Sequence, residues 1–193
     1  MKMSKFTKQR IMDSFLDLLN QKSLDKLTVK DVIEVAEVNR NTFYYYFEDI
    51  YDLLNNVFLK KFDDFCNETR EKTTFYSEYV RAAEFIFTNK NAMEHVYHSK
   101  DKALIQQYME RVTKLFVRHF VEQAASDYDL SDDGITYLTC FYSNAIVGDT
   151  MHWIQDGMPP YRENYLFLVS KSFEDSIDDM ICSYLRWKNH APL

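Results

Sequence analysis

Residues 28–53 read TVKDVIEVAEVNRNTFYYYFEDIYDL, and this stretch decides the fold. Thr28 predicts a helix N-cap because Asp31 stands three residues later, in the place of the acid of a capping box. The residues EVN break that helix after about two turns. Asn39 then predicts the cap of a further short helix that ends near Phe47. The stretch is therefore predicted to form two short helices joined by a three-residue turn.

The side chains of this stretch divide into an inner and an outer set. The apolar ones are expected to form a small core: Val29, Val32, Ile33, Ala36, Val38, Phe43, Phe47 and Leu53. The second helix then exposes hydrogen-bonding side chains with only one charge: Arg40, Asn41, Thr42, Tyr44, Tyr45 and Tyr46. Such a surface suits base edges and phosphates in a major groove. An ordinary helical hairpin with surface tyrosines has the same periodicity, so the pattern alone leaves both interpretations open.

The whole chain is predicted to be all-α. It has 193 residues with three glycines and three prolines, too few turn-formers for an all-β protein of this size. Helices are expected at about 7–21, 28–36, 39–47, 50–70, 75–89, 91–98, 102–125, 132–156 and 163–188. Two domains are expected: an N-terminal three-helix DNA-binding domain (1–48) and a C-terminal helical regulatory and dimerisation bundle (49–193). No run of 18 apolar residues or signal peptide occurs, so a cytoplasmic protein is expected.

The net charge of −7 at first argues against nucleic-acid binding. The charges are unevenly distributed, however: residues 1–60 hold nine Lys/Arg and nine Asp/Glu and are neutral. The first ten residues carry Lys2, Lys5, Lys8 and Arg10 with no acid. A neutral segment with a basic arm can bind phosphates with one end of the molecule only. The charge pattern therefore permits DNA binding.

The chain resembles the TetR/AcrR family of bacterial transcriptional regulators. The resemblance covers residues 10–54 and rests on the capped TVxDV helix, AxV at the turn, TFYYYF, and an acid before a Leu-Leu pair. WIQDG at 153–157 looks like the tryptophan and glycine near the end of that family's penultimate helix. Four positions depart from the pattern: the family's first-loop glycine, a small residue of its second helix, its turn glycine and its phosphate-binding lysine are here Ser23, Ile33, Glu37 and Ile50.

The resemblance implies a regulator, expected to be a repressor, that binds a palindromic operator in double-stranded DNA as a homodimer. It places Asn39, Arg40, Thr42, Tyr44 and Tyr46 at operator bases and phosphates. The full predicted DNA-contacting set is Lys5, Thr28, Asn39, Arg40, Asn41, Thr42, Tyr44, Tyr45 and Tyr46. The basic arm is expected to replace the missing lysine of the fourth helix.

The C-terminal part carries two further predictions. Apolar residues recur every fourth position over 169–185, and small residues on the preceding helix allow close approach. The predicted dimer interface is Ala145, Gly148, Phe173, Ile177 and Ile181. This part is also rich in aromatic residues and methionine, which favours a cavity for a small apolar or aromatic effector, lined by Tyr108, Phe141 and Tyr142. The alternative is that these aromatic side chains simply fill the core.

Other kinds of site find little support. No nucleophile motif or glycine-rich phosphate loop occurs, so neither an enzyme nor a cofactor is expected. His95 and His98 share a helical face but have no third ligand, and no metal site is predicted. Cys66, Cys140 and Cys182 are expected to be reduced, buried thiols. Two rival functions stay open: a coactivator of the same fold controlled by a protein partner, and a helical ligand-binding protein that does not bind DNA.

Overall fold

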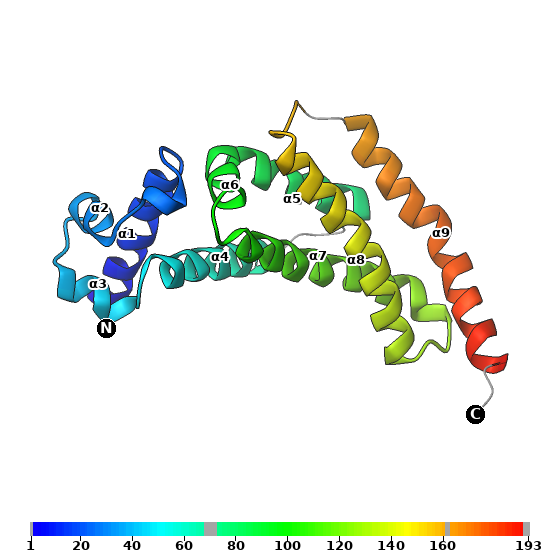
Figure 1. Cartoon of the computed structure of the whole chain (residues 1–193). Helices are drawn as coiled ribbons and strands as arrows, with labels where there is room; N and C mark the ends of the chain where they lie inside the picture. The colour runs from blue at the N-terminus through cyan, green and yellow to red at the C-terminus, as the bar shows by residue number, and fades with distance from the viewer. Residues whose placement is uncertain (1, 68–72, 161–162, 191–193) are drawn as a thin grey trace. The chain divides into compact units, whose positions relative to one another are not determined.

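The computed structural model describes residues 2–67, 73–160 and 163–190, and within these ranges the chain is built from helices (Figure 1). The α-helices are α1 (Lys2–Leu19), α2 (Val29–Val35), α3 (Arg40–Tyr46), α4 (Ile50–Asn67), α5 (Phe75–Thr88), α6 (Lys90–Tyr97), α7 (Lys102–Ala124), α8 (Asp132–Gln155) and α9 (Glu163–His190). Two short 3-10 helices, η1 (Leu24–Lys26) and η2 (Ala125–Asp127), join them. The all-α prediction is confirmed. No helix in the described ranges is long and apolar enough to cross a membrane.

The chain packs as two compact units. Unit 1 consists of residues 1–69 and 86–108, and unit 2 consists of residues 70–85 and 109–193. Helices α5 and α7 each begin in one unit and end in the other. Helices α4 and α6 therefore belong to the same unit as α1, α2 and α3. We call α2, α3 and the turn between them the helix-turn-helix segment. Helices α8 and α9 belong to the same unit as the remaining parts of α5 and α7.

Unit 1 has a core that the first four helices share. Helix α1 packs on α2 and α4, and α2 packs on α3. The side chains that fill this core are at most 2% exposed: Ile11, Phe15, Leu19, Val32, Ala36, Phe43, Phe47, Leu53 and Leu54. They include most of the small core expected from residues 28–53. Val29, Ile33 and Val38 are only half-buried.

Unit 2 has an aromatic core. Phe75 of α5 stacks on Phe173 of α9 with ring centroids 4.1 Å apart, and it meets the edge of Phe120 of α7 at 5.5 Å. Tyr142 of α8 meets Phe173 edge-on at 4.8 Å. Such ring pairs add to the free energy gained from burial alone. The core therefore joins parts of α5, α7, α8 and α9 in one unit.

This core corrects one prediction about dimerisation. Phe173, Ile177 and Ile181 were expected at an interface between two chains, but they are 4%, 5% and 0% exposed within a single chain. The stripe that recurs every four residues packs against α5, α7 and α8 of its own subunit. These three side chains have no free surface left for a second copy.

The end of α8 follows the predicted stop signal. Gly157 has φ 73°, and Met158 follows with φ 46° and a fully buried side chain. The indole Nε1 of Trp153 donates to the carbonyl of Pro159 at 3.1 Å. Because both residues after the helix take left-handed backbone angles, the chain reverses tightly here. Trp153 thus stabilises the reversal of the chain through its hydrogen bond, and Gly157 supplies a left-handed backbone conformation.

The structure describes the side chains of two of the three cysteines that were expected to be buried thiols. Cys140 and Cys182 are free thiols and half-buried. The side chains of Cys66 and Lys2 lie outside the described residues.

Candidate nucleic-acid interface

The start of α2 is held by the predicted capping box. The Thr28 hydroxyl accepts from the backbone N–H of Asp31 at 3.2 Å, and the Asp31 carboxylate accepts from the N–H of Thr28 at 2.9 Å. The carboxylate also accepts a hydrogen bond from the Thr28 hydroxyl and forms an ion pair with Lys22 at 2.9 Å. These bonds, the Thr28 hydroxyl first and Lys22 next, lower the pKa of Asp31 to about 2. Thr28 is therefore a structural cap as well as an exposed candidate contact.

The turn between α2 and α3 is made without glycine. Glu37 takes a positive φ of 50°, the region that the family's glycine would occupy at no steric cost. Arg10 of α1 donates from Nη2 to the Glu37 carbonyl at 3.3 Å. The Glu37 side chain is exposed. The arginine of the basic arm nearest the turn thus supports a strained backbone.

Helix α3 is capped and anchored by very few residues. The Asn39 carbonyl oxygen Oδ1 accepts from the Thr42 N–H at 2.8 Å and from the Thr42 hydroxyl at 3.0 Å. Phe43 is fully buried, and Phe47, which follows the helix, is 2% exposed. Two phenyl rings therefore fix α3 to the core, while Arg40, Asn41, Tyr44 and Tyr45 are exposed.

The exposed face of α3 carries an arginine and tyrosines. The guanidinium of Arg40 lies 5.7 Å from the ring centre of Tyr44, and its Nη2 approaches the Tyr44 hydroxyl at 3.5 Å. Tyr45, 77% exposed, meets Tyr46 edge-on at 4.8 Å. Arg40 and Tyr44 are one turn apart and form a cation–π pair. A planar guanidinium with neighbouring phenol hydroxyls suits the acceptors on a guanine edge or on a phosphate.

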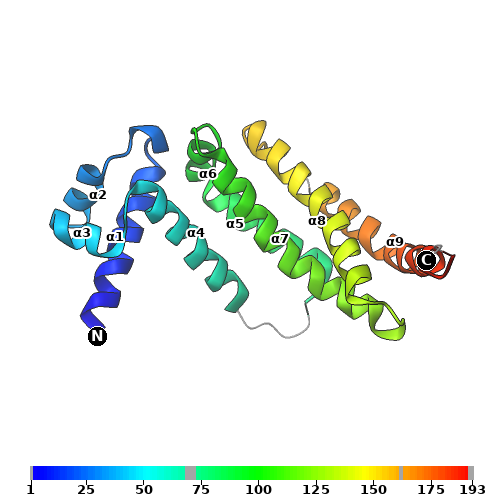
Figure 2. The ribbon, with the colours of Figure 1, turned by 60° about the horizontal axis from the view of Figure 1, so that its bottom comes forward.

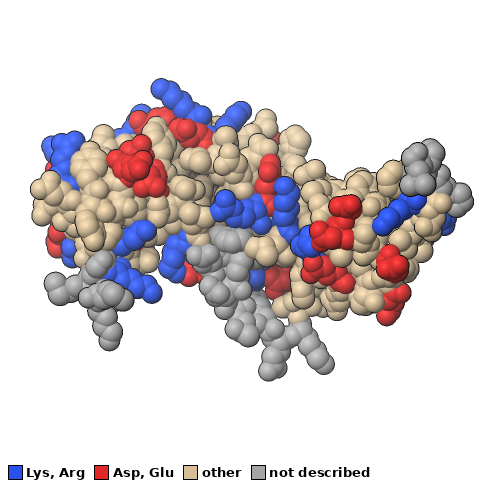
Figure 3. Space-filling model, turned by 90° about the horizontal axis from the view of Figure 1, so that it is seen from below, with Lys and Arg blue, Asp and Glu red and all other residues tan. Residues whose placement is uncertain are grey.

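The nine predicted contact residues all lie in unit 1. Seven are exposed: Lys5, Thr28, Asn39, Arg40, Asn41, Tyr44 and Tyr45. Thr42 and Tyr46 are half-buried. Figure 3 shows several Lys and Arg side chains on the part of the surface that carries this unit, at the left. Six of the nine belong to α3 itself and Asn39 is its cap, which brings most of the set together.

The beginning of α4 differs from the family pattern as expected. Ile50, which replaces the phosphate-binding lysine, is 7% exposed and belongs to the core. Asp49 caps the helix by accepting from the N–H groups of Tyr51 and Asp52, both at 2.8 Å. Lys8 donates to Asn56 Oδ1 at 2.8 Å and lies 5.3 Å from the ring centre of Phe47. Within the first ten residues, Lys8 therefore contacts other side chains of the protein, whereas Lys5 is exposed.

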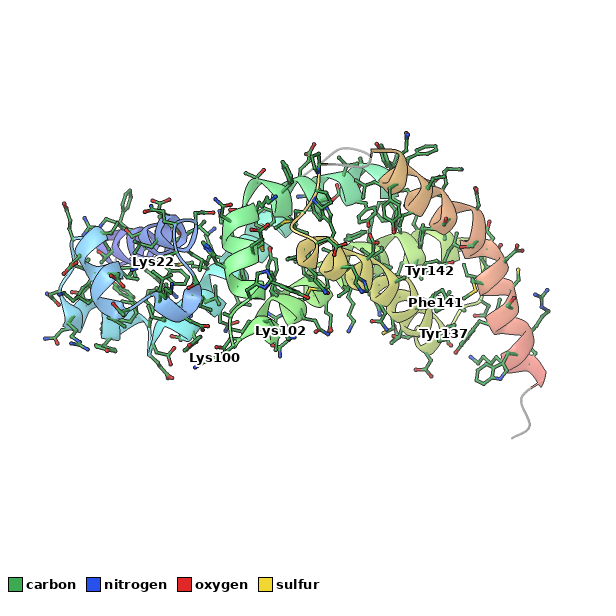
Figure 4. All side chains as sticks on the ribbon, turned by 45° about the horizontal axis from the view of Figure 1, so that its top comes forward. Lys22, Lys100, Lys102, Tyr137, Phe141 and Tyr142 are labelled. Atoms are coloured by element: carbon green, nitrogen blue, oxygen red, sulfur yellow. The ribbon has the colours of Figure 1, made fainter. Side chains whose placement is uncertain are left out.

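The three predicted effector residues have three different surroundings, and Figure 4 labels two of them, Phe141 and Tyr142. Tyr108 belongs to unit 1, where it is 7% exposed and stacks on Phe58 at 4.7 Å. Tyr142 belongs to unit 2, where its hydroxyl bonds Ser176 Oγ at 2.8 Å and burial raises its pKa. Phe141 is 51% exposed on α8. This corrects the expectation that Phe141 faces an interior cavity.

The sequence reasoning missed two buried hydroxyl groups on α8. Thr139 and Ser143 are 5% and 0% exposed, and their side-chain oxygens have no hydrogen-bond partner among the described residues. They lie one helical turn apart. Buried polar atoms in folded proteins are nearly always hydrogen-bonded, so this pair calls for an explanation. The available signal was the occurrence of two hydroxyl residues at i and i+4 in an apolar helix.

The two predicted interface residues on α8 are exposed. Ala145 faces solvent, and a Cβ placed on Gly148 would meet no atom within 4 Å. Tyr137, at 49%, and Phe141, at 51%, extend the same exposed face toward the start of the helix. The face is uncharged over these four residues.

Two family models match the chain. The model described as "Bacterial regulatory proteins, tetR family" matches residues 11–57, and the model described as "Transcriptional regulator C-terminal region" matches residues 81–175. A curated relative, the HTH-type dhaKLM operon transcriptional activator DhaS of Lactococcus lactis subsp. lactis, is 23% identical over 150 residues, which is 76% of this chain and 78% of the relative.

Solved structures share the fold. The dihydroxyacetone kinase operon activator DhaS superposes with a TM-score of 0.65 at 18% identity, covering 93% of this chain and 96% of the other. A TetR-family transcriptional regulator from Streptomyces coelicolor gives 0.59 at 14% identity, covering 94% and 89%. At these identities the structural likeness shows the fold alone.

Proposed function

The chain belongs to the TetR family of bacterial transcriptional regulators, and from this premise we propose that it binds a palindromic DNA operator as a homodimer through α3. One observation carries the proposal. Helix α3 has Phe43 as its buried side chain and is followed by the buried Phe47, while Arg40, Tyr44 and Tyr45 are exposed, with the Arg40 guanidinium over the Tyr44 ring. These side chains contribute little to the core and present the donors and flat surfaces that a major groove accepts. Binding to a bacterial operator puts its action in the cytoplasm.

The operator is found by selecting bound fragments from the genome of the source organism. Wild-type protein is expected to enrich a short inverted repeat, and Arg40→Ala is expected to lose that enrichment. The matched control is Val35→Ala, which changes a side chain of α2 that is 50% exposed and lies outside the predicted contact set. Equal enrichment by wild type and Arg40→Ala would refute the contact surface, and no enrichment by wild type would refute DNA binding.

The dimer is proposed to form through the exposed face of α8. Tyr137, Phe141, Ala145 and Gly148 form an uncharged face, and Gly148 leaves room for a helix of the second copy. A twofold interface uses the same face of both subunits and is therefore closed. The proposed face replaces the α9 stripe, which the core of unit 2 already occupies.

Sizing with light scattering tests this face. Phe141→Asp is expected to give folded monomers, because Phe141 is half exposed and a buried unpaired carboxylate at an interface is costly. Leu115→Asp on α7, at a similarly exposed position, is the control and should stay dimeric. A Phe141→Asp protein that remains dimeric would show that α8 is not the interface.

Regulation is proposed to act through an effector bound in unit 2 that lowers operator affinity, so that the protein is a repressor. Support comes from the buried hydroxyls of Thr139 and Ser143, which have no partner among the described residues, and from the half-buried Tyr142 hydroxyl, which bonds Ser176. An apolar or aromatic compound with one or two polar atoms would offer hydrogen-bond partners to these hydroxyls. By linkage, the effector and the operator weaken each other's binding by the same factor.

Thermal-shift screening with such compounds tests the effector. A hit is expected to raise the midpoint of wild type, and Ser143→Ala is expected to reduce that rise without destabilising the unliganded protein, because the variant removes a buried hydroxyl that has no partner. The control is Thr136→Ala on the exposed side of the same helix. If no compound raises the thermal midpoint of wild type, the proposed effector in unit 2 is refuted.

A second candidate function is activation. The relative matched over three quarters of this chain is named as an activator of an operon, and its solved structure carries the same description. An activator of this fold would be controlled by a protein partner. A transcriptional reporter downstream of the selected operator distinguishes the two: deletion of a repressor raises its output, and deletion of an activator lowers it.

A further inference from the structure

His95 belongs to α6, which contacts α1 within unit 1. Figures 1 and 2 label both helices. The Nδ1 of His95 is 2.6 Å from the carbonyl oxygen of Leu19, the last residue of α1. Because a carbonyl oxygen can only accept, the imidazole must donate, which places a hydrogen on Nδ1. The two residues are 76 positions apart, so the bond joins separate parts of the chain.

The Leu19 carbonyl lies in the last turn of α1 and meets His95 as a donor. The last four carbonyls of a helix have no partner within the helix. The neighbouring ones are satisfied locally: Leu16 accepts from the backbone and side chain of Asn20, and Leu18 accepts from the N–H groups of Gln21 and Lys22. The Leu19 side chain is 1% exposed. His95 therefore caps α1 from another helix, at a residue that is anchored in the core.

The position of α6 along the chain gives the bond a second role. Helix α6 belongs to unit 1 and buries Ala92, Met93 and Val96 there. In one direction the chain continues into α5, of which residues 75–85 belong to unit 2. In the other direction it continues into α7, of which residues 109–124 belong to unit 2. Both covalent paths out of α6 thus lead into helices that end in unit 2.

We propose that His95 is a positioning residue for operator recognition: by holding the Leu19 carbonyl, it ties the end of α1, and with it the helix-turn-helix segment, to α6. The proposal rests on the proposed function as an operator-binding dimer. Two recognition helices in a dimer must match the spacing of two half-sites, so anything that fixes each segment narrows the spacings that are accepted. Loss of the bond between His95 and the Leu19 carbonyl leaves the α3 surface intact and widens the range of half-site spacings that the dimer accepts.

The test compares three operators: the one selected from the genome, and the same sequence with one base pair added or removed between its half-sites. Wild type is expected to bind the two altered operators much more weakly than the selected one. His95→Leu removes the donor and is expected to reduce that discrimination about tenfold, of the order of one hydrogen bond. His95→Asn carries an amide nitrogen at the position of Nδ1 and is expected to restore it. His98→Leu, at an exposed position one turn away, is the control.

The outcomes separate a positioning role from a purely structural one. If His95→Leu weakens binding to all three operators by the same factor, with a lower thermal midpoint, the residue only stabilises the fold and the proposal is overturned. If His95→Leu does not fold, His95→Gln takes its place: its nitrogen stands one bond further out, at the position of Nε2, so it should lose the discrimination that His95→Asn keeps. Wild type that binds no DNA would refute the proposed function itself, whereas unchanged discrimination in His95→Leu refutes the His95 proposal alone.

Discussion

Helices α3 and α9 use their side chains in opposite ways. In α3 only Phe43 is buried, while Tyr44 is 48% and Tyr45 is 77% exposed. In α9, Phe173, Ile177 and Ile181 are at most 5% exposed and pack against three other helices of unit 2. The comparison teaches where changes should be felt. Substitutions on α3 should alter binding and leave the fold intact, and substitutions along the inner face of α9 should alter the fold first.

The largest expected effect is on α9. Phe173→Ala removes a ring that stacks on Phe75 at 4.1 Å and meets Tyr142 at 4.8 Å. The free energy of unfolding should fall by ~3–5 kcal/mol, as for other buried phenylalanines. Chemical denaturation measures it, and Asp179→Ala on the exposed side of α9 should change it by less than ~0.5 kcal/mol. A small effect of Phe173→Ala would mean that α9 does not depend on its own subunit for packing.

The opposite behaviour is expected on α3. Arg40→Ala and Tyr44→Ala should leave the thermal midpoint nearly unchanged and weaken operator binding by ~1–3 kcal/mol each. Because the Arg40 guanidinium contacts the Tyr44 ring, the double variant should lose less than the sum of the two single losses. Fluorescence anisotropy with labelled operator measures both. Strict additivity would show that the two side chains reach the DNA independently.

Thr28 lies between these two extremes because it is both a cap and a candidate contact. Thr28→Ala removes the capping box and should lower the free energy of unfolding by ~0.5–2 kcal/mol. Thr28→Ser keeps the hydroxyl and should recover most of the loss. If Thr28→Ala weakens operator binding without affecting unfolding, Thr28 is a contact residue and its capping bonds are unimportant.

The same capping box makes unit 1 sensitive to acid. The pKa of Asp31 in the folded protein is about 2, below its usual 3.8, so the unfolded chain binds a proton first as the pH falls. The stabilisation is therefore fully present above about pH 4 and is lost as the pH approaches 2. Urea unfolding between pH 5 and 2.5 should show this slope, and Asp31→Asn should flatten it. An unchanged slope in that variant would assign the acid sensitivity to other carboxylates.

The smallest expected effect compares two glycines of α8. Gly148→Ala should raise the free energy of unfolding of the subunit by ~0.5–1 kcal/mol, because alanine favours a helix and the added Cβ meets nothing within 4 Å. Gly134→Ala should lower it, since its Cβ would come within 2.5 Å of Leu130 and 2.7 Å of Tyr184. In sedimentation, Gly148→Ala should also weaken the dimer if a second α8 approaches closely. A tighter dimer would exclude that approach.

The sequence predicted the helix-turn-helix segment well because its information is local. The Thr28–Asp31 capping box and the Asn39 cap are each set by residues three apart, and both are confirmed. Glu37 stands at the position of the family's turn glycine, and its positive φ was seen only in the structure. Local signals of this kind fix where a short helix begins and which face it exposes.

The faces of the longer helices were harder to predict for a physical reason. A stripe of apolar residues such as Phe173 and Ile177 shows that a face is covered, but not whether the cover is the same chain or a second copy. Phe141 is a large apolar residue of the kind that usually fills a core, but it is 51% exposed. The bond between His95 and Leu19 joins residues 76 positions apart, and no local pattern announces it.

The interrupted path of unit 1 has a consequence for how the protein is synthesised. Residues 86–108 complete a unit whose first part ends at residue 69, so they leave the ribosome later. At ~5–20 residues per second, the intervening chain takes on the order of seconds to appear. During that interval Phe58 has no Tyr108 to stack on and α1 has no His95 at its end. The nascent helix-turn-helix segment is therefore incomplete on one side, and that apolar side is the surface a ribosome-associated chaperone would hold.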